Sequence, residues 1–254
     1  MGGEGLKGRV AFQSCPLCAG PHAELRRDDC TTHPLWQDVI GPELVWQRCH
    51  QCAHIFTNGY FTDEAARVIF AQTQECQQIG YMVEDSRPVC GRLVERVPVK
   101  SGTWLDVGFG SGALMFAAEE AGFTVEGVDV RADLADTMDR LGYNVRQGEL
   151  HHLEPVQRDV ISLCDVIEHV PFPGDLLAEA RARGRVLLLS CPNAGSMAWR
   201  ALSGAGENPY WREIEHFHNF TRERLYGLLR ETGWEPLSYS VSERYRLGME
   251  IVAE

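Results

Sequence analysis

Two aspartates and a run of glycines in the middle of the chain could bind a nucleotide-like ligand. Asp106 stands two residues before a turn that contains Gly108, Gly110 and Gly112. Glycine permits left-handed backbone conformations and lets a ligand approach the main chain, and the helix predicted after the turn presents unpaired N–H groups. Asp129 ends the next apolar segment, where an acid binds ribose hydroxyls in two-strand nucleotide folds. A carboxylate at Asp106 would repel a pyrophosphate and attract a cationic amino-acid group, so the pattern favours a cationic ligand with a ribose.

This order of acid, glycine turn, helix, strand and acid resembles the S-adenosylmethionine (SAM) site of class I methyltransferases. Glycines also occur in nicotinamide-binding turns and in ordinary strand-to-helix turns, but an ordinary turn does not predict the second acid. The resemblance implies a Rossmann-like sheet with cofactor-binding residues after its first two strands. These residues are Asp106, Gly108, Phe109, Gly110, Gly112, Asp129 and Val130.

Two later segments extend the expected cofactor site. Glu149 and Leu150 follow the third predicted strand, where the family often places an acid against the adenine amino group. A solvated loop acid is the alternative for Glu149. The segment from Cys164 to Val170 resembles the D-V-x-E-H-V stretch of small-molecule methyltransferases, including the ubiquinone-pathway O-methyltransferases. This likeness implies that Cys164 and Asp165 border the methionine end of the cofactor.

The same segment offers His169, which the resemblance places beside the cofactor or the substrate and which is a further candidate base. Some relatives bind a divalent metal here through an acid, acid and histidine set, and Asp165, Glu168 and His169 keep that spacing. Adjacent side chains rarely converge on one ion, so packing around the cofactor is the alternative. The sequence leaves open whether a second, catalytic metal binds.

A second histidine-rich segment begins at Glu215 and carries the pattern E-H-x-H-x-F-T. The pattern is frequent in this group of methyltransferases, and sugar C-methyltransferases with N-terminal zinc modules carry Y-x-E-H-F here, with catalytic side chains. This chain has Glu213 in place of that tyrosine. Imidazole titrates near neutral pH, so we expect His216 to act as a base or to contact the substrate, with Glu215 orienting its ring. His218 is the second candidate, and the alternative is that both histidines only anchor the loop.

Four of the nine cysteines form two pairs with metal-binding spacing: Cys15 with Cys18, and Cys49 with Cys52. Each C-x-x-C pair places two thiolates on one tight turn, and two such pairs fit tetrahedral zinc. Four sulfurs close the coordination shell, so the ion would be structural, in a zinc-ribbon-like module. Redox-active or unpaired thiols are the alternative. Nearby histidines could replace a cysteine, but we expect local hydrogen bonds from them; they are His22, His33, His50 and His54.

Strand and helix signals alternate from residue 102 onward. We predict strands at 103–107, 124–129, 143–147, 159–164 and 185–190, with two more in 234–242 and 246–253, the last antiparallel. The alternation predicts an α/β fold, a seven-stranded and mostly parallel doubly wound sheet that binds ligands at the carboxyl ends of its strands. We expect a zinc-ribbon-like module at 1–61, a helical connector covering the cofactor site at 62–100 and a class I methyltransferase domain at 101–254. Trp36 and Trp46 either cover the acceptor site or form the small core of the module.

The composition narrows the class of partners. The chain has 24 basic and 36 acidic residues, a net charge of -12, and no basic stripe that could follow a phosphate backbone. We therefore expect no nucleic-acid partner. No apolar run is long enough for a bilayer, and the N-terminus lacks the apolar core of a signal peptide, so we expect no membrane partner and a cytoplasmic location.

The expected activity is transfer of a methyl group from SAM to an oxygen or carbon of a small molecule, such as a natural-product intermediate or a sugar nucleotide. A zinc-ribbon RNA methyltransferase and a non-catalytic SAM-binding scaffold are the alternatives, and a nicotinamide dehydrogenase is a more distant one. The identity of the acceptor, the choice among O-, C- and N-methylation and the oligomeric state stay open at this point.

Overall fold

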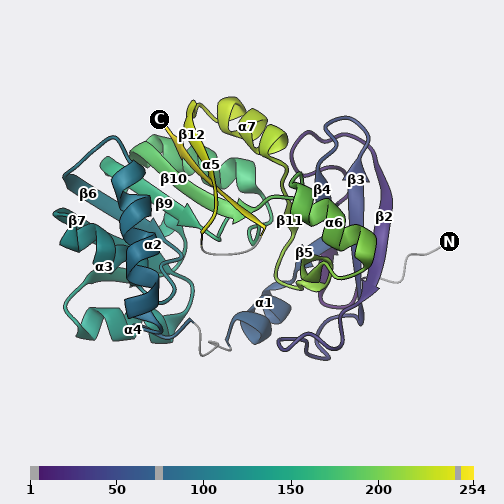
Figure 1. Ribbon diagram of the computed structural model, residues 1–254. Coiled ribbons are helices and arrows are strands. Elements are labelled where there is room, and N and C mark those ends of the chain that lie inside the picture. The colour runs from purple at the N-terminus through teal and green to yellow at the C-terminus, as the bar shows by residue number, and fades with distance from the viewer. Residues whose placement is uncertain (1–5, 72–76, 244–246) are drawn as a thin grey trace. The chain divides into compact units, whose positions relative to one another are not determined.

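The computed structural model describes residues 6–71, 77–243 and 247–254 (Figure 1). The chain forms two compact units. The first unit consists of residues 1–72, 168–173 and 192–225, and the second consists of residues 73–167, 174–191 and 226–254. The chain therefore passes from one unit to the other five times.

A seven-stranded sheet forms the centre of the second unit, in the order β12-β13-β10-β9-β6-β7-β8. Its strands are β6 (Gly102–Val107), β7 (Phe123–Asp129), β8 (Asn144–Gln147), β9 (Arg158–Cys164), β10 (Gly184–Pro192), β12 (Pro236–Val241) and β13 (Gly248–Ala253). Strands β6 to β10 pair in parallel, whereas β12 and β13 pair antiparallel. The mostly parallel, seven-stranded sheet predicted from the sequence is confirmed. Strands β9 and β10 are almost wholly buried, as central parallel strands are, while the edge strand β8 is largely exposed.

Helices of the second unit follow the strands in alternation. They are α2 (Val83–Arg96), α3 (Ala113–Glu120), α4 (Ala132–Arg140), α5 (Pro173–Arg183) and α7 (Arg222–Glu231), with a 3₁₀ turn at Leu150–His152; α5 and α7 begin in the first unit. Helices α2, α3 and α4 bury their apolar faces in one core with the sheet, around Trp104 and Met115, both fully buried. The backbone N–H of Gly80, just before α2, donates to the carbonyl of Ser111 at 3.0 Å. The segment before α2 therefore lies against the glycine turn.

Two small sheets form the first unit. In one, β1 (Arg9–Ala11) pairs antiparallel with β5 (Gly59–Phe61). The other has the order β11-β4-β3-β2 and contains β2 (His22–Asp29), β3 (Glu43–Cys49), β4 (Ile55–Thr57) and β11 (His218–Asn219). Helices α1 (Asp63–Phe70) and α6 (Met197–Ala205) and a 3₁₀ turn at Pro209–Arg212 complete it. Thr62 caps α1, since its hydroxyl accepts from the N–H of Ala65.

The units divide the chain differently from the sequence-based domain limits. Residues 168–173 and 192–225 were expected in the methyltransferase domain, yet they belong to the first unit, which runs to residue 72 instead of 61. Long-range pairing explains the difference. His218 of β11 pairs with Phe56 of β4, and the indole N–H of Trp46 donates to the carbonyl of Trp211 at 2.9 Å. Trp46 is fully buried, so it belongs to the core of the first unit.

Candidate active site and metal centre

The glycine turn joins β6 to α3 in the conformation that the sequence requires. Gly108, Gly110 and Gly112 have φ values of 70°, 51° and 77°, which L-residues with a side chain rarely adopt. A Cβ atom on Gly108 would lie 2.7 Å from the Cγ2 of Val166. Glycine is therefore required in this turn. Because glycine has no side chain, a ligand can approach the main chain of the turn closely.

The two expected acids lie at the ends of adjacent strands and are both 2 % exposed. Asp129 accepts from the backbone N–H of Gly110 at 3.0 Å and from that of Arg131 at 2.9 Å. This carboxylate ties the glycine turn to the end of β7. Asp106 accepts from the hydroxyl of Ser162 on the neighbouring strand β9 at 2.5 Å. Ser162 carries no signal in the sequence, because a hydroxyl in an apolar strand has no characteristic spacing.

Strand order brings the remaining cofactor candidates to the same edge of the sheet. Strands β9, β6, β7 and β8 are neighbours, and the candidates follow their carboxyl ends. Val130 is 47 % exposed, whereas Phe109 and Leu150 are buried. The side chain of Glu149 is 64 % exposed and caps the 3₁₀ turn at His152.

The end of β9 carries a second unusual backbone conformation. Asp165 has a φ of 60°, uncommon for a residue other than glycine. Its N–H donates to the carbonyl of Ser190, and its carboxylate accepts from the hydroxyl of the same serine at 3.2 Å. Strain of this kind is frequent at functional sites. Cys164, directly before it, is 9 % exposed at the end of the strand.

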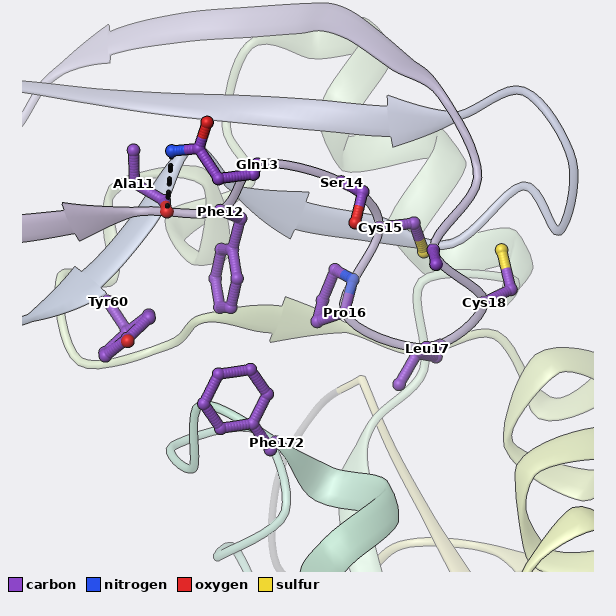
Figure 2. Close-up of a pocket in the computed structure, with 11 residues that line it drawn as sticks. Ala11, Phe12, Gln13, Ser14, Cys15, Pro16, Leu17, Cys18, Tyr60 and Phe172 are labelled. Carbon is purple, nitrogen blue, oxygen red and sulfur yellow. Dashed lines mark hydrogen bonds between the residues drawn. The ribbon is translucent and has the colours of Figure 1, made fainter.

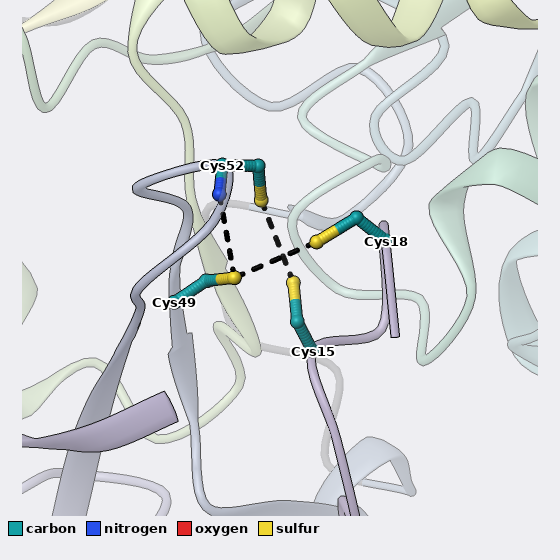
Figure 3. A group of neighbouring side chains, drawn as sticks. All are labelled: Cys15, Cys18, Cys49 and Cys52. Atoms are coloured by element: carbon teal, nitrogen blue, oxygen red, sulfur yellow. Dashed lines mark hydrogen bonds between the residues drawn. The ribbon is translucent and has the colours of Figure 1, made fainter. Parts of the chain in front are cut away.

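The four paired cysteines converge in the first unit, with their sulfurs facing one another (Figure 3). The Sγ atoms of Cys15 and Cys52 lie 3.6 Å apart, and those of Cys18 and Cys49 lie 3.5 Å apart. Zinc–sulfur bonds of about 2.3 Å in a tetrahedron place the sulfurs about 3.8 Å apart. The spacing of this cluster therefore suits a four-thiolate zinc ion.

Both cysteine turns share a backbone feature that favours thiolate ligands. The residue after each pair, Ala19 and Ala53, has a positive φ of 55° and 58°. At the second turn, the N–H groups of Gln51 and Cys52 point at the Cys49 sulfur from 3.4 Å. Burial opposes ionisation of Cys49, but these N–H donors and hydrogen bonds with Cys18 and Cys52 lower its pKa to about 7, whereas burial raises the pKa of Cys15 and Cys52. A thiolate is the form that binds a metal.

A second cluster in the first unit unites one acid and two histidines. The ligand atoms of Glu168, His169 and His216 all lie within 4.8 Å of one another. The Nδ1–H of His169 donates to the carbonyl of Glu215 at 3.0 Å, which fixes the tautomer because a carbonyl can only accept. The rings of His169 and His216 meet edge to face, with centroids 4.7 Å apart. Burial lowers the pKa of His216 to about 3, so this ring is neutral near pH 7.

His218 does not join that cluster. Its Nε2–H donates to the carbonyl of Val170 at 2.9 Å, and its Nδ1 accepts from the Nε2–H of His54 at 3.0 Å. Both nitrogens are therefore occupied within the first unit, and burial lowers the pKa of His218 to about 4. This geometry supports a bracing role for the ring. Glu215 is buried and holds His169 through its backbone carbonyl.

Sequence reasoning missed the partner of Glu213. The Nε2–H of His33 donates to the carboxylate of Glu213 at 2.8 Å, while its Nδ1 accepts from the N–H of Leu35. Burial opposes ionisation of Glu213, but His33 and the nearby His216 hold its pKa below the usual range. The two residues are 180 positions apart, so no local pattern could have joined them. Glu213, which the resemblance aligns with the tyrosine of the sugar enzymes, is thus part of a half-buried histidine–acid pair.

An apolar groove lies beside the first cysteine turn and has a volume of about 530 Å³ (Figure 2). Figure 2 shows Phe12, Tyr60 and Phe172 around it, with residues 13–18 forming the opposite side. Phe172 is 46 % exposed. Among the residues that the structure describes, those that line the groove include no acid and no histidine, so we assign it no catalytic role.

The parallel sheet, the glycine turn and the acid that ends the second strand define a class I SAM-dependent methyltransferase. The chain belongs to the methyltransferase-domain family, because the family model described as "Methyltransferase domain" matches residues 82–239, more than half of its 254 residues. None of the curated proteins matches the sequence.

Solved structures share this fold at low sequence identity. Magnesium protoporphyrin IX methyltransferase from Synechocystis PCC 6803, with bound S-adenosylhomocysteine, has a TM-score of 0.54 and 15% identity, covering 77% of this chain and 88% of that one. The pyocyanin biosynthetic protein PhzM has a TM-score of 0.56 and 16% identity, covering 75% of this chain and 58% of that one. An O-methyltransferase family 2 protein from Planctomyces limnophilus in complex with apigenin has a TM-score of 0.53 and 18% identity, covering 65% of this chain and 56% of that one. At these identities the likeness is one of fold.

In the part of the chain that the structure describes, no helix has the length and apolar character needed to cross a membrane.

Proposed function

We propose that this enzyme transfers a methyl group from SAM to an oxygen or carbon atom of a small molecule. The observation that carries the proposal is the chain path after β9. Asp165 follows the end of β9 at the cofactor edge of the sheet, and Glu168 and His169 follow it after three and four peptide links. Three links limit the Cα atoms of Asp165 and Glu168 to about 11 Å apart whatever the arrangement of the two units. Groups that could prepare an acceptor are thus tethered to the cofactor edge.

The residues of the second unit fit the cofactor. The open glycine turn accepts a ligand against its main chain, and Asp129 has lone pairs left for ribose hydroxyls after it accepts from Gly110 and Arg131. Asp106 provides the negative charge for the amino-acid end. When bound, SAM supplies an electrophilic methyl group on a sulfonium sulfur. We also propose that Cys15, Cys18, Cys49 and Cys52 hold a structural zinc ion.

The acceptor must lose a proton as it takes the methyl group. Its oxygen or carbon forms the new bond to the methyl carbon while the bond between that carbon and sulfur breaks, and the proton leaves the acceptor. We place this proton transfer at the cluster of His216 and His169, whose rings are neutral or held in a defined tautomer. Such general-base help contributes about 10²–10⁴-fold in rate.

A small-molecule acceptor agrees with the charge of the protein. The net charge of -12 would repel a polyanionic RNA substrate at long range. Two acids near the histidine cluster, the half-buried Glu213 and the buried Glu215, add to this repulsion. The zinc module would then have a structural role.

The test is a turnover assay with defined acceptor classes. The full-length zinc-loaded protein is incubated with SAM and, in separate reactions, with sugar nucleotides, hydroxylated aromatic compounds, compounds with an acidic C–H, and RNA oligonucleotides. Formation of S-adenosylhomocysteine above the acceptor-free rate in a small-molecule arm supports the proposal, and Asp129→Ala, assayed at limiting SAM, is the control with lowered turnover. Turnover confined to RNA would favour the RNA alternative. Tight S-adenosylhomocysteine binding without turnover in any arm would favour a binding scaffold.

A further inference from the structure

We propose that Glu168, His169 and His216 form a second metal site, which binds a divalent transition-metal ion through one carboxylate and two imidazoles. The three ligand atoms already lie within 4.8 Å of one another. Bonds of about 2.1 Å to a common ion separate two ligand atoms by at most about 4.2 Å. Small side-chain rotations are therefore enough to close the site.

His169 is held as metal-ligating histidines are. Its Nδ1–H donates to the backbone carbonyl of Glu215 at 3.0 Å, so Nε2 carries the lone pair. A ligating histidine almost always donates its other ring N–H to a carbonyl or carboxylate in this way, which orients the ring and raises its basicity.

His216 presents an unexplained polar atom. The residue is 7 % exposed, and its Nδ1 atom is buried with no hydrogen-bond partner among the described residues. Buried polar atoms are nearly always paired, and each exception requires an explanation. The edge-to-face contact with His169, at 4.7 Å between centroids, already brings the two imidazoles together.

Glu168 supplies the charge that a cation needs. It is 1 % exposed, and its carboxylate lies within ligand distance of both imidazoles. The backbone N–H groups of Phe217 and His218 donate to its carbonyl at 2.7 Å and 3.3 Å, which fixes its main chain beside the second histidine segment. One carboxylate and two neutral imidazoles carry a single negative charge, and this donor set suits zinc, iron or cobalt.

The site differs from the acid, acid and histidine set suggested by local spacing. His216 takes the place of Asp165, because the fold brings a distant residue to Glu168 and His169. Asp165 instead contacts Ser190 in the second unit.

Three protein ligands leave at least one coordination position for another molecule. The role of that position rests on the proposed function: a bound acceptor oxygen would release its proton to solvent more readily, because a divalent ion lowers the pKa of a coordinated hydroxyl. The alkoxide would then form the bond to the methyl carbon, while the carbon–sulfur bond breaks and the metal keeps its oxidation state. With the ion bound, the two histidines act as ligands and no longer as bases.

Metal stoichiometry tests the site directly. Full-length protein is saturated with Zn²⁺, freed of excess ion by gel filtration and analysed for zinc; calorimetry gives the affinity of the second ion. We expect two zinc ions per chain in the wild type and one in Glu168→Gln and His169→Ala, with second-site affinity lowered by at least about a hundredfold. The matched control is His151→Ala, since the side chain of His151 is 51% exposed and lies outside the cluster. Circular dichroism verifies that each variant is folded.

A saturated wild type with one zinc per chain, or two ions retained in both variants, overturns the metal site. Cobalt separates the two centres independently, because thiolate ligation at the cysteine cluster gives an intense charge-transfer absorption that nitrogen and oxygen ligands lack. The failure of each proposal is distinct. Full turnover by protein with one zinc per chain would reject the second metal site and favour a histidine base. Two bound ions without turnover on any acceptor would reject only the proposed methyl transfer.

Discussion

Asp129 illustrates how a single buried carboxylate can join the fold to ligand binding. Its two oxygens accept backbone N–H groups from Gly110 and Arg131. It therefore fixes the glycine turn and the start of α4 at once, and presents its remaining lone pairs at the edge of the sheet. Hydrogen bonds to charged groups contribute about 1.5–3 kcal/mol each.

The first prediction concerns this carboxylate. Asp129→Ala should weaken S-adenosylhomocysteine binding by at least about tenfold, since it removes a charged acceptor worth about 1.5 kcal/mol or more. Isothermal titration calorimetry measures the affinity. Asp136→Ala, on the exposed side of the following helix, is the matched control and should bind like the wild type. Unchanged affinity in a folded Asp129→Ala protein would reject this position as part of the cofactor site.

The second prediction separates the two histidines of one segment. His216→Ala should lower kcat by at least about a hundredfold, whether the ring acts as base or as metal ligand, and should leave cofactor affinity within about threefold. His218→Ala should lower kcat less and lower the melting temperature more, because both ring nitrogens hold buried partners. Steady-state kinetics, calorimetry and thermal unfolding give the three values. Near-normal turnover in folded His216→Ala protein would assign that ring a structural role.

At the scale of elements, the two units differ in whether local sequence patterns or long-range contacts determine their structure. The second unit gains its form from alternating strands and helices, and the strands β6 to β10 begin and end within two residues of their predicted limits. Local hydrophobic patterns and glycines determine these elements, so the sequence predicts them well.

The first unit depends on contacts such as His33 with Glu213 and Trp46 with Trp211. These pairs have no local signal, and the histidine–acid cluster was therefore only partly predictable: local spacing grouped Glu168 and His169 with Asp165, but it did not predict that His216 joins Glu168 and His169.

The third prediction concerns the cysteine turns. The double variant Cys15→Ser, Cys49→Ser should lower the zinc content by one ion per chain and loosen β2, β3 and β4, because a structural zinc ion contributes directly to folding energy. Elemental analysis and hydrogen exchange measure the two effects. The seven-stranded sheet should keep its exchange protection. Cys30→Ser is the control, since Cys30 is buried but donates only to backbone carbonyls. Full zinc content in the double variant would contradict the assignment.

At the scale of the whole molecule, the division into units does not follow the order of the chain. Residues 192–225 supply α6, the 3₁₀ turn with Trp211 and the strand β11 to the unit that begins the chain. Trp211 is 6 % exposed and lies edge to face against Trp46, with centroids 5.7 Å apart. The stability of the unit that holds the four paired cysteines thus depends on residues far beyond them.

The fourth prediction follows from this dependence. Trp211→Ala should lower the free energy of unfolding by about 3–5 kcal/mol, the usual cost of removing a buried tryptophan. Hydrogen exchange should show the loss in β3, which carries Trp46, although the substitution lies in another part of the sequence. Val241→Ala, at a position 65 % exposed, should change stability by less than about 0.5 kcal/mol. Undiminished protection of β3 in Trp211→Ala would show that the cysteine module is stable without its distant partner.

The strand β11 lies late in the sequence, so its pairing with β4 is delayed while the chain is being synthesised. Thr57 and Phe217, which meet beside this strand, are 160 residues apart. At about 5–20 residues per second, a ribosome needs roughly 8–30 s to cover that interval. During this time all four cysteines of the metal cluster have already emerged, while the edge of β4 still lacks its neighbour. A free strand edge invites pairing with other chains. Until β11 is made, this edge of β4 is therefore open to pairing with other chains.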